Sequence, residues 1–238
     1  MLTLQSNPEP LLDYIQFKHH YDVEQLQAEL SICLQQEWGD HFNQKDYQGC
    51  WQSISLRSGS GREADIYANY GVSTYQDTPL LDRLPYFREV IDAWGCDKET
   101  IRLLALHPGS EIKPHRDLGC NYKEGHFRIH IPVQTNANVI FKVTEETLAL
   151  KEGSCWYIDF SQTHSIKNDG NEVRVHLVMD GIRNGWTDSL FAAHGYDFDA
   201  EHVAEKYDAA TNDQIIAELE RMNTDTARAL IKNLRAGR

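Results

Sequence analysis

The sequence contains little cysteine and no C-x-x-C pair. Its cysteines are odd in number and widely scattered: Cys33, Cys50, Cys96, Cys120 and Cys155. A zinc knuckle or a disulfide framework requires closely spaced or paired cysteines, so we expect neither. Unpaired thiols persist in a reducing compartment, and we therefore expect a cytoplasmic protein.

Positive charge and long apolar runs are scarce too. The chain has 23 Lys and Arg against 36 Asp and Glu, a formal net charge of −13, and no basic block. Because phosphate neutralisation requires clustered basic side chains, this composition argues against nucleic acid as a partner. No run approaches the roughly 18 apolar residues of a membrane helix. The first six residues lack the basic and then apolar pattern of a signal peptide, so we expect no membrane partner.

Short β-like runs occupy the middle of the chain. Residues 22–38 precede them and are predicted to form a helix, capped by Asp22 at its start and by Gly39 at its end. Residues 80–94 are a second, weaker helical stretch. The predicted strands are 51–56, 101–106, 127–135, 138–143, 154–160 and 173–179, with turn residues between them. Many short strands at this spacing predict a mainly β fold, a sandwich or jelly roll.

At 238 residues, one domain with extensions is the expected architecture. We place a helical extension that packs on the core at 1–48, the β core at 49–186 and a helical region at 187–238. Two groups of apolar residues share helical faces in the last region: Ile215, Leu219 and Met222, and Leu230, Ile231 and Leu234. We expect these helices to pack on the core or to form a homodimer contact.

Two His-x-Asp sequences occur, and their surroundings differ. Asp22 of the first is followed by Val-Glu-Gln-Leu, which is typical of a helix cap. His115-Arg116-Asp117 instead lies in a loop between two β-like runs, where a metal could be reached. With His164 it supplies two imidazoles and one carboxylate, a ligand set that suits non-haem Fe(II) and leaves positions open for a co-substrate and O2.

Two predicted strands each place an Arg and a His on one face. Arg128 and His130 alternate with apolar side chains in residues 127–133, and Arg174 and His176 do so in residues 174–179. A solvated outer face is one interpretation. Because both runs follow a candidate metal ligand, we favour a polar pocket wall, in which the planar fork of an arginine suits a carboxylate.

An ordered series of segments within residues 100–186 resembles the aspartyl/asparaginyl β-hydroxylase family, which includes small bacterial hydroxylases of free proline. The segments are Arg102–Leu104, Pro108–Asp117, Arg128–Pro132, Gly153–Trp156, Asp159–His164 and Asn168–Asp180. The resemblance implies a double-stranded β-helix (jelly roll) with flanking helices that uses Fe(II), 2-oxoglutarate and O2, with ascorbate as a candidate supporting reductant. Since the chain keeps Asp117, where some members lack the metal-binding carboxylate, its pattern is most similar to the proline hydroxylases.

The resemblance also implies the cofactor-binding residues. His115, Asp117 and His164 match the metal ligands. Arg174 matches the arginine that binds the distal carboxylate of 2-oxoglutarate. Such a charged hydrogen bond contributes about 1.5–3 kcal/mol to binding.

Four residues are candidates for the pocket wall. Arg128 and His130 match the strand that contacts co-substrate or substrate carboxylates in the family, and Arg102 matches an arginine that is often assigned to the substrate. Trp156 is a further candidate for binding the substrate, with packing in the core as the alternative interpretation.

The favoured function is hydroxylation of an unactivated C–H bond of a free amino acid such as proline, with release of succinate and CO2. One alternative keeps this chemistry and applies it to an Asp or Asn residue of a peptide, or to a carrier-tethered amino acid. Another alternative is a cupin-like module that binds a metal or an acid without turnover. A panel of substrates distinguishes the first two, and succinate release distinguishes both from the third.

Overall fold

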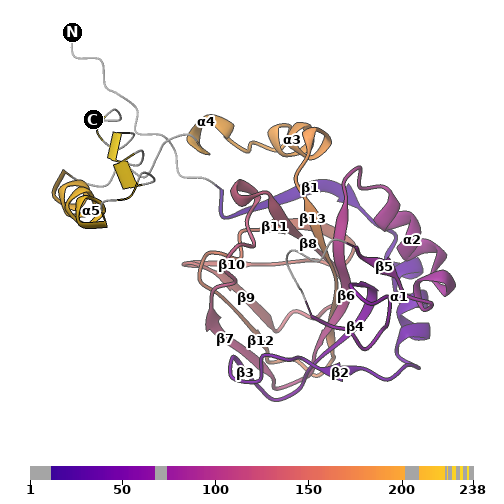
Figure 1. Cartoon of the computed structure of the whole chain (residues 1–238). Coiled ribbons are helices and arrows are strands. Elements are labelled where there is room, and N and C mark those ends of the chain that lie inside the picture. The colour runs from indigo at the N-terminus through magenta and orange to yellow at the C-terminus, as the bar shows by residue number, and fades with distance from the viewer. Residues whose placement is uncertain are drawn as a thin grey trace, which may run out of the picture. The chain divides into compact units, whose positions relative to one another are not determined.

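The computed structural model describes residues 12–67, 74–201 and 209–222, together with Thr224, Ala227, Arg228, Ile231, Lys232 and Arg235. The chain divides into one unit formed by Leu11–Tyr196 and a second formed by Met1–Pro10 and Asp197–Arg238. All of the described strands belong to the first unit (Figure 1). The candidate site residues therefore lie within this unit.

Two antiparallel sheets build the first unit (Figure 1). The larger has eight strands in the order β1-β11-β8-β13-β6-β4-β2, with β5 paired to β4, and the smaller has five in the order β10-β9-β12-β7-β3. The larger sheet contains β1 (Tyr14–His20), β2 (Gly39–Asp40), β4 (Trp51–Ser58), β5 (Gln76–Asp77), β6 (Lys98–Leu106), β8 (His126–Gln134), β11 (Ser154–Ile158) and β13 (Arg174–Ile182). The smaller contains β3 (Tyr47–Gln48), β7 (Glu111–His115), β9 (Val139–Val143), β10 (Glu146–Leu148) and β12 (His164–Asn168).

Apolar side chains from both sheets pack against one another in the space between the sheets. The larger sheet contributes Trp51, Leu104, Leu106, Trp156, Ile158 and Val178 to this cluster, and the smaller contributes Ile112, Phe141, Val143, Leu148 and Ile166. Two antiparallel sheets that share one core form a β-sandwich, the architecture to which jelly rolls belong. The predicted mainly β, jelly-roll fold is confirmed, and each predicted strand is present with shifted ends.

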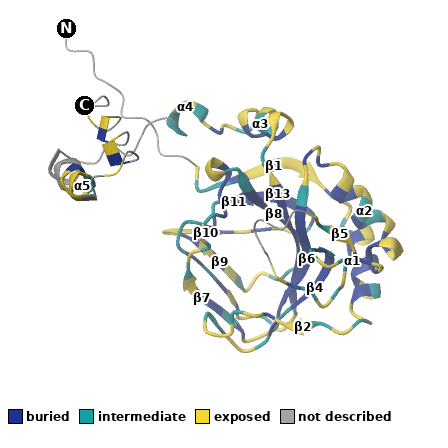
Figure 2. Cartoon of the chain, viewed as in Figure 1, coloured by how far each residue is buried: buried dark blue, intermediate teal, exposed yellow. Residues whose placement is uncertain are grey.

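Helices cover the outer face of the larger sheet (Figure 1), and the strands that they cover are coloured as buried in Figure 2. They are α1 (Val23–Cys33), α2 (Pro85–Asp92) after a 3-10 turn at Leu81–Arg83, and α3 (Gly185–Ala192). Phe191 of α3 packs edge-on against Phe17 and Phe127 of the sheet. With both faces covered, β6, β8 and β13 are buried along almost their whole length. Alternate residues of these strands therefore face either the core between the two sheets or the layer packed under the helices, and neither face is exposed to solvent.

The helix predicted at 22–38 is shorter than expected. Asp22 caps it as predicted, because its side chain accepts from the Gln25 N–H at 3.2 Å. The helix ends at Cys33, where the buried stripe ends, and the Cys33 carbonyl accepts from the Trp38 indole at 2.9 Å and from the Gln36 N–H at 3.0 Å. Gly39 is not a helix cap, since it pairs with Ser53 in the edge strand β2.

Three strands of five or more residues were not predicted. β1 lies in the region expected to be helical and pairs with β11 at the edge of the larger sheet, with Ile15 and Phe17 buried. β7 and β12 form the middle of the smaller sheet. β7 is interrupted by Pro114 and both are partly exposed, so their apolar alternation is weak.

The second unit contains the helices α4 (Phe198–Glu201) and α5 (Ala209–Met222). Ile216, Ala227 and Ile231 are buried within the described part of this unit. Among the predicted face residues, Leu230, Leu234 and the side chain of Met222 lie outside the described residues, so the homodimer contact stays a prediction. None of the helices described for this chain is long and apolar enough to cross a membrane.

Candidate metal centre and its pocket

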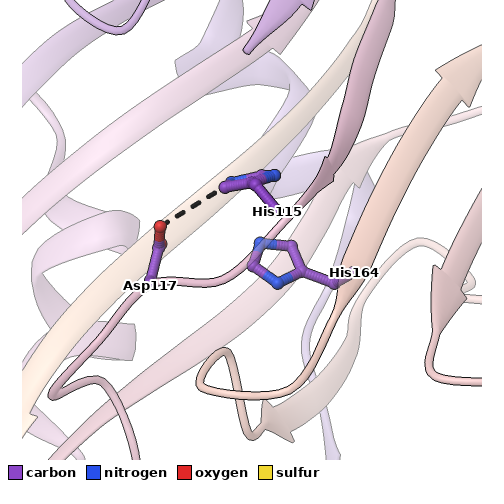
Figure 3. A group of neighbouring side chains, drawn as sticks. All are labelled: His115, Asp117 and His164. Atoms are coloured by element: carbon purple, nitrogen blue, oxygen red, sulfur yellow. Dashed lines mark ion pairs between the residues drawn. The ribbon is translucent and has the colours of Figure 1, made fainter.

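The ends of two paired strands bring the predicted metal ligands together. His115 is the last residue of β7 and His164 is the first residue of β12, and the two are directly opposed in the antiparallel ladder. Asp117 follows two residues after β7, where its N–H donates to the Phe160 carbonyl at 2.8 Å. Figure 3 shows the three side chains converging from these segments.

An irregularity in β7 aims His115 at this point. Ile112 belongs to the core between the sheets, and in a regular strand the residue three positions later would face away from that core. The register shifts between the pairs His164–His115 and Ile166–Ile112, so β7 holds one more residue than β12 over this stretch. This extra residue is a β-bulge, which lets Ile112 and His115 both face inward.

The ligand atoms are close enough to share one ion. One nitrogen or oxygen from each of His115, Asp117 and His164 lies within 4.8 Å of the others. His115 Nε2 is 3.6 Å from Asp117 Oδ1, the contact drawn in Figure 3, and the two imidazole centroids are 4.2 Å apart. Such a spacing suits three ligands on one face of an ion.

Backbone carbonyls fix the orientation of both imidazoles. His115 Nδ1 is 2.8 Å from the Lys113 carbonyl, and His164 Nδ1 is 3.0 Å from the Gln162 carbonyl. A carbonyl can only accept, so each Nδ1 carries the proton and each Nε2 presents a lone pair. Burial lowers the pKa of His164 to about 4, which keeps this imidazole neutral near pH 7. Two neutral imidazoles and one carboxylate fit a divalent transition metal, and three protein ligands leave further positions open.

A cavity of about 380 Å³ is lined by His115 and Asp117, two of the three predicted metal ligands. Its lining residues are His41, Phe42, Asn43, Trp51, Arg102, Leu104, His115, Arg116, Asp117, Leu118 and Arg128. A cavity of this size suits a small molecule. A second cavity of about 500 Å³ is mostly apolar and includes His176, but contains none of the three metal ligands. We therefore place the candidate site at the smaller cavity.

Arg128 joins this site to a buried carboxylate. Its Nη1 donates to Asp117 Oδ2 at 2.9 Å, while Nε and Nη2 donate to Asp180 Oδ1 and Oδ2 at 2.6 and 3.2 Å. Asp180 also accepts from Arg102 Nη2 at 3.0 Å and from the Thr100 hydroxyl at 2.6 Å. Burial alone would raise the pKa of the Asp180 carboxyl, but the charges of Arg128 and Arg102 hold it below its usual value.

Asp180 was not among the predicted site residues. It follows Arg174 and His176 at even spacing, on the inward face of β13, so strand periodicity could have identified it. The predicted strand ended at Met179, one residue before Asp180, whereas β13 continues to Ile182.

Arg174 and His130 meet near His176, between the sheets. Arg174 Nη2 donates to His176 Nδ1 at 2.7 Å, and His130 Nδ1 lies 3.2 Å from the same nitrogen. Among the described residues, Arg174 Nε and His130 Nε2 are buried without a hydrogen-bond partner. Burial lowers the pKa of Arg174 to about 9, so the guanidinium is charged near pH 7. An unpartnered buried cationic donor is costly, and a bound carboxylate would satisfy it.

Trp156 lies apart from the cavity wall. Its indole N–H donates to the Ser154 hydroxyl at 2.7 Å, and its ring belongs to the core between the sheets. It is absent from the residues that line the cavity beside the metal ligands. This placement favours the alternative interpretation, core packing, although a substrate role for Trp156 stays a prediction.

An aromatic wall that the sequence did not predict faces the arginines. His41 stacks on Trp51 with ring centroids 3.5 Å apart and on Phe42 at 4.4 Å. Burial, together with the charges of Arg102 and Arg128, lowers the pKa of His41 to about 3, so this ring is neutral. His41 lies in an irregular segment between two short edge strands, which gave no periodic signal.

A jelly roll with a His-Asp-His site beside an arginine-lined cavity defines the class of protein. The chain belongs to the aspartyl/asparaginyl β-hydroxylase family, whose model, described as Aspartyl/Asparaginyl beta-hydroxylase, matches residues 20–184. The predicted family is therefore confirmed, and the chain is a hydroxylase of that family. Its nearer likeness to the free-proline hydroxylases stays a prediction.

Solved structures of low identity are similar in fold. An oxidoreductase of the 2OG-Fe(II) oxygenase family from Burkholderia pseudomallei is 12% identical, with a TM-score of 0.49, over 73% of this chain and 87% of that chain. HygX from Streptomyces hygroscopicus, with nickel and 2-oxoglutarate bound, is 7% identical, with a TM-score of 0.48, over 73% and 84%. A prolyl-4-hydroxylase from Pseudomonas putida is 11% identical, with a TM-score of 0.45, over 73% and 94%. Because these identities and TM-scores are low, the assignment to the family rests on the family match alone.

Proposed function

We propose that this protein is an Fe(II)- and 2-oxoglutarate-dependent dioxygenase that hydroxylates an unactivated C–H bond of a free amino acid such as proline. The observation that carries the proposal is the convergence of His115, Asp117 and His164, with both Nε2 lone pairs presented, in a chain of this hydroxylase family. These three residues would hold the Fe(II).

When bound, the iron supplies the redox chemistry that couples decarboxylation of 2-oxoglutarate to hydroxylation. One oxygen atom of O2 enters succinate and the other enters the product, with release of CO2. The residues of the chain have the remaining tasks, which are to bind, orient and shield the two organic substrates.

Arg174 is the residue that we assign to the distal carboxylate of 2-oxoglutarate. Its unpartnered Nε and the nearby His130 Nε2 lie between the sheets, where a bound acid is shielded from water. The rings of His164 and Phe160 are 4.7 Å apart, and those of Phe160 and His130 are 4.9 Å apart. This series of ring contacts places the group around Arg174 close to the metal ligand His164, as a keto acid that reaches both would require.

The cavity beside the metal is where we place the amino-acid substrate. Arg102 and Arg128 supply positive charge for its carboxylate, and the neutral His41–Trp51 stack supplies a flat apolar wall for its side chain. The volume of about 380 Å³ supports a substrate of amino-acid size.

A peptide or carrier-tethered substrate is the second candidate. Phe42 and Leu118 line the cavity and are 46% and 83% exposed, so apolar surface continues outward from its wall. A longer substrate could bury this surface on binding.

Succinate release tests the proposal. Purified protein with Fe(II), ascorbate, 2-oxoglutarate and O2 should release succinate in response to one free amino acid in a panel that also contains short Asp and Asn peptides. The variant Asp117→Ala should fold and release none. If only the peptides stimulate succinate release, the substrate is a peptide and not a free amino acid. A folded, iron-loaded wild type that releases no succinate would contradict the dioxygenase and favour a non-catalytic binding module.

A further inference from the structure

We propose that Asp180 is a positioning residue which, through Arg128, selects the Asp117 oxygen that faces the metal. The inference rests on the metal site of the proposed function. It assigns Arg128 a structural task at the metal ligand in addition to its predicted contact with a carboxylate. Metal affinity, measured without turnover, is the property that tests it.

The first step of the argument is the geometry of Arg128. Its guanidinium holds Asp180 in a bidentate pair, with Nε to Oδ1 at 2.6 Å and Nη2 to Oδ2 at 3.2 Å. The planar fork is fixed by this pair, so the direction of Nη1 is fixed as well. Nη1 donates to Asp117 Oδ2 at 2.9 Å.

The second step concerns Asp117 itself. Its side chain is 34% exposed and lies in the loop after β7, so packing alone does not hold the carboxylate in one orientation. With Oδ2 engaged by Arg128, Oδ1 is the oxygen 3.6 Å from His115 Nε2. Arg128 therefore turns one defined oxygen toward the imidazoles.

The third step is the rigidity of Asp180. It is 2% exposed, and Thr100 and Arg102 donate to it from β6, the neighbouring strand. The carboxylate is thereby held from two strands of the larger sheet, whereas the metal ligands come from the end of the smaller sheet and the adjoining loop. The chain Asp180–Arg128–Asp117 joins the two sheets at the metal site.

Replacing Asp180 by asparagine keeps its shape but removes its charge and one acceptor, and it presents an N–H to an arginine that can only donate. Loss of partners that orient a ligand typically weakens metal binding about tenfold to a hundredfold. We expect a loss of this size for Asp180→Asn when Mn(II) is titrated into the full-length apo protein in a calorimeter. Arg128→Lys, which lacks the fork, should show the same loss.

The matched control is Glu29→Gln. Glu29 is also a buried carboxylate, 8% exposed, but it accepts the N–H groups of Tyr86 and Phe87 at the start of α2, on the outer face of the larger sheet. This variant should lose stability and keep the wild-type Mn(II) affinity. It separates general destabilisation from a loss of ligand orientation.

A double-mutant cycle decides whether the effect passes through Asp117. In an Asp117→Ala background, Asp180→Asn should weaken Mn(II) binding no further. An equal loss with and without Asp117, or wild-type affinity in Asp180→Asn, would overturn the inference. If Asp180→Asn fails to fold by circular dichroism, Arg128→Lys replaces it in the same cycle. If the three residues do not form the metal site of the proposed function, Asp117→Ala will leave Mn(II) binding unchanged, and this result distinguishes the two failures.

Discussion

Replacing Arg174 by lysine should weaken 2-oxoglutarate binding and leave metal binding unchanged. Arg174 is 1% exposed, and its Nη2 is bonded to His176 while its Nε is the buried donor left for a ligand. Lysine keeps the positive charge but lacks the planar fork, so it cannot bond His176 and a carboxylate in the same geometry. Loss of one charged hydrogen bond costs about 1.5–3 kcal/mol, which is about tenfold to a hundredfold in affinity.

The assay is calorimetric titration of 2-oxoglutarate into the Mn(II)-loaded protein, followed by the KM for 2-oxoglutarate in succinate release. Arg88→Lys is the control, because Arg88 forms only half-exposed ion pairs with Asp77 and Asp82. Mn(II) affinity should be equal in all three proteins, since Arg174 does not contact the metal ligands. Wild-type affinity for 2-oxoglutarate in Arg174→Lys would refute the assignment of the distal carboxylate to this residue.

Three further predictions concern stability. The buried histidines His41, His130, His164 and His176 all have pKa values lowered by burial. Between the folded and unfolded values the unfolded chain binds more protons, so stability should be lost as pH falls from about 6.5 to about 4, with His164 alone contributing about 3 kcal/mol over that whole window. Urea unfolding of the apo protein with equal stability at pH 7 and pH 4 would contradict this. Trp156→Phe should cost about 0.5–1.5 kcal/mol through loss of its bond to Ser154 and leave the substrate KM unchanged, whereas a raised KM would return Trp156 to the substrate site. Glu29→Gln should lower the free energy of unfolding by about 1.5–3 kcal/mol with unaltered turnover, and an unchanged unfolding midpoint would show that its bonds to the start of α2 do not stabilise the fold.

Two of the candidate metal ligands were predictable because His115 and Asp117 form a short motif between predicted strands. The sequence placed this motif in a loop, whereas the structure places His115 at the end of β7 and His164 at the start of β12. His115 and Asp117 are two residues apart, and the turns around them broke the β-like pattern clearly. Arg174 and Arg128 could be assigned to a pocket because polar residues alternated with apolar ones along well-defined strands. The structure places both of them between the sheets, as this alternation implied.

The remaining features of the site could not be predicted from the sequence, for physical reasons. The strand β7 carries Pro114 and a bulge, so its period-two pattern is broken where the site needs it. His41 reaches the pocket by stacking on Trp51, which lies ten residues later in the sequence, and no periodic pattern encodes such a contact. The bridging role of Arg128 between Asp117 and Asp180 depends on residues far apart in the sequence.

The bulge in β7 has a consequence for how such a site could arise or be lost. Ile112 and His115 are three residues apart, so they face the same interior only because the strand bulges between them. If the strand became regular with its length unchanged, Ile112 would stay buried while the imidazole would turn to the opposite side of the sheet. Deleting one residue at Lys113 or Pro114 would instead leave a spacing of two, so a regular strand would bury Ile112 and still face the imidazole inward. A single-codon deletion could therefore remove the bulge while preserving both the architecture and the direction of the ligand, whereas a change that straightens the strand at constant length could silence the metal centre.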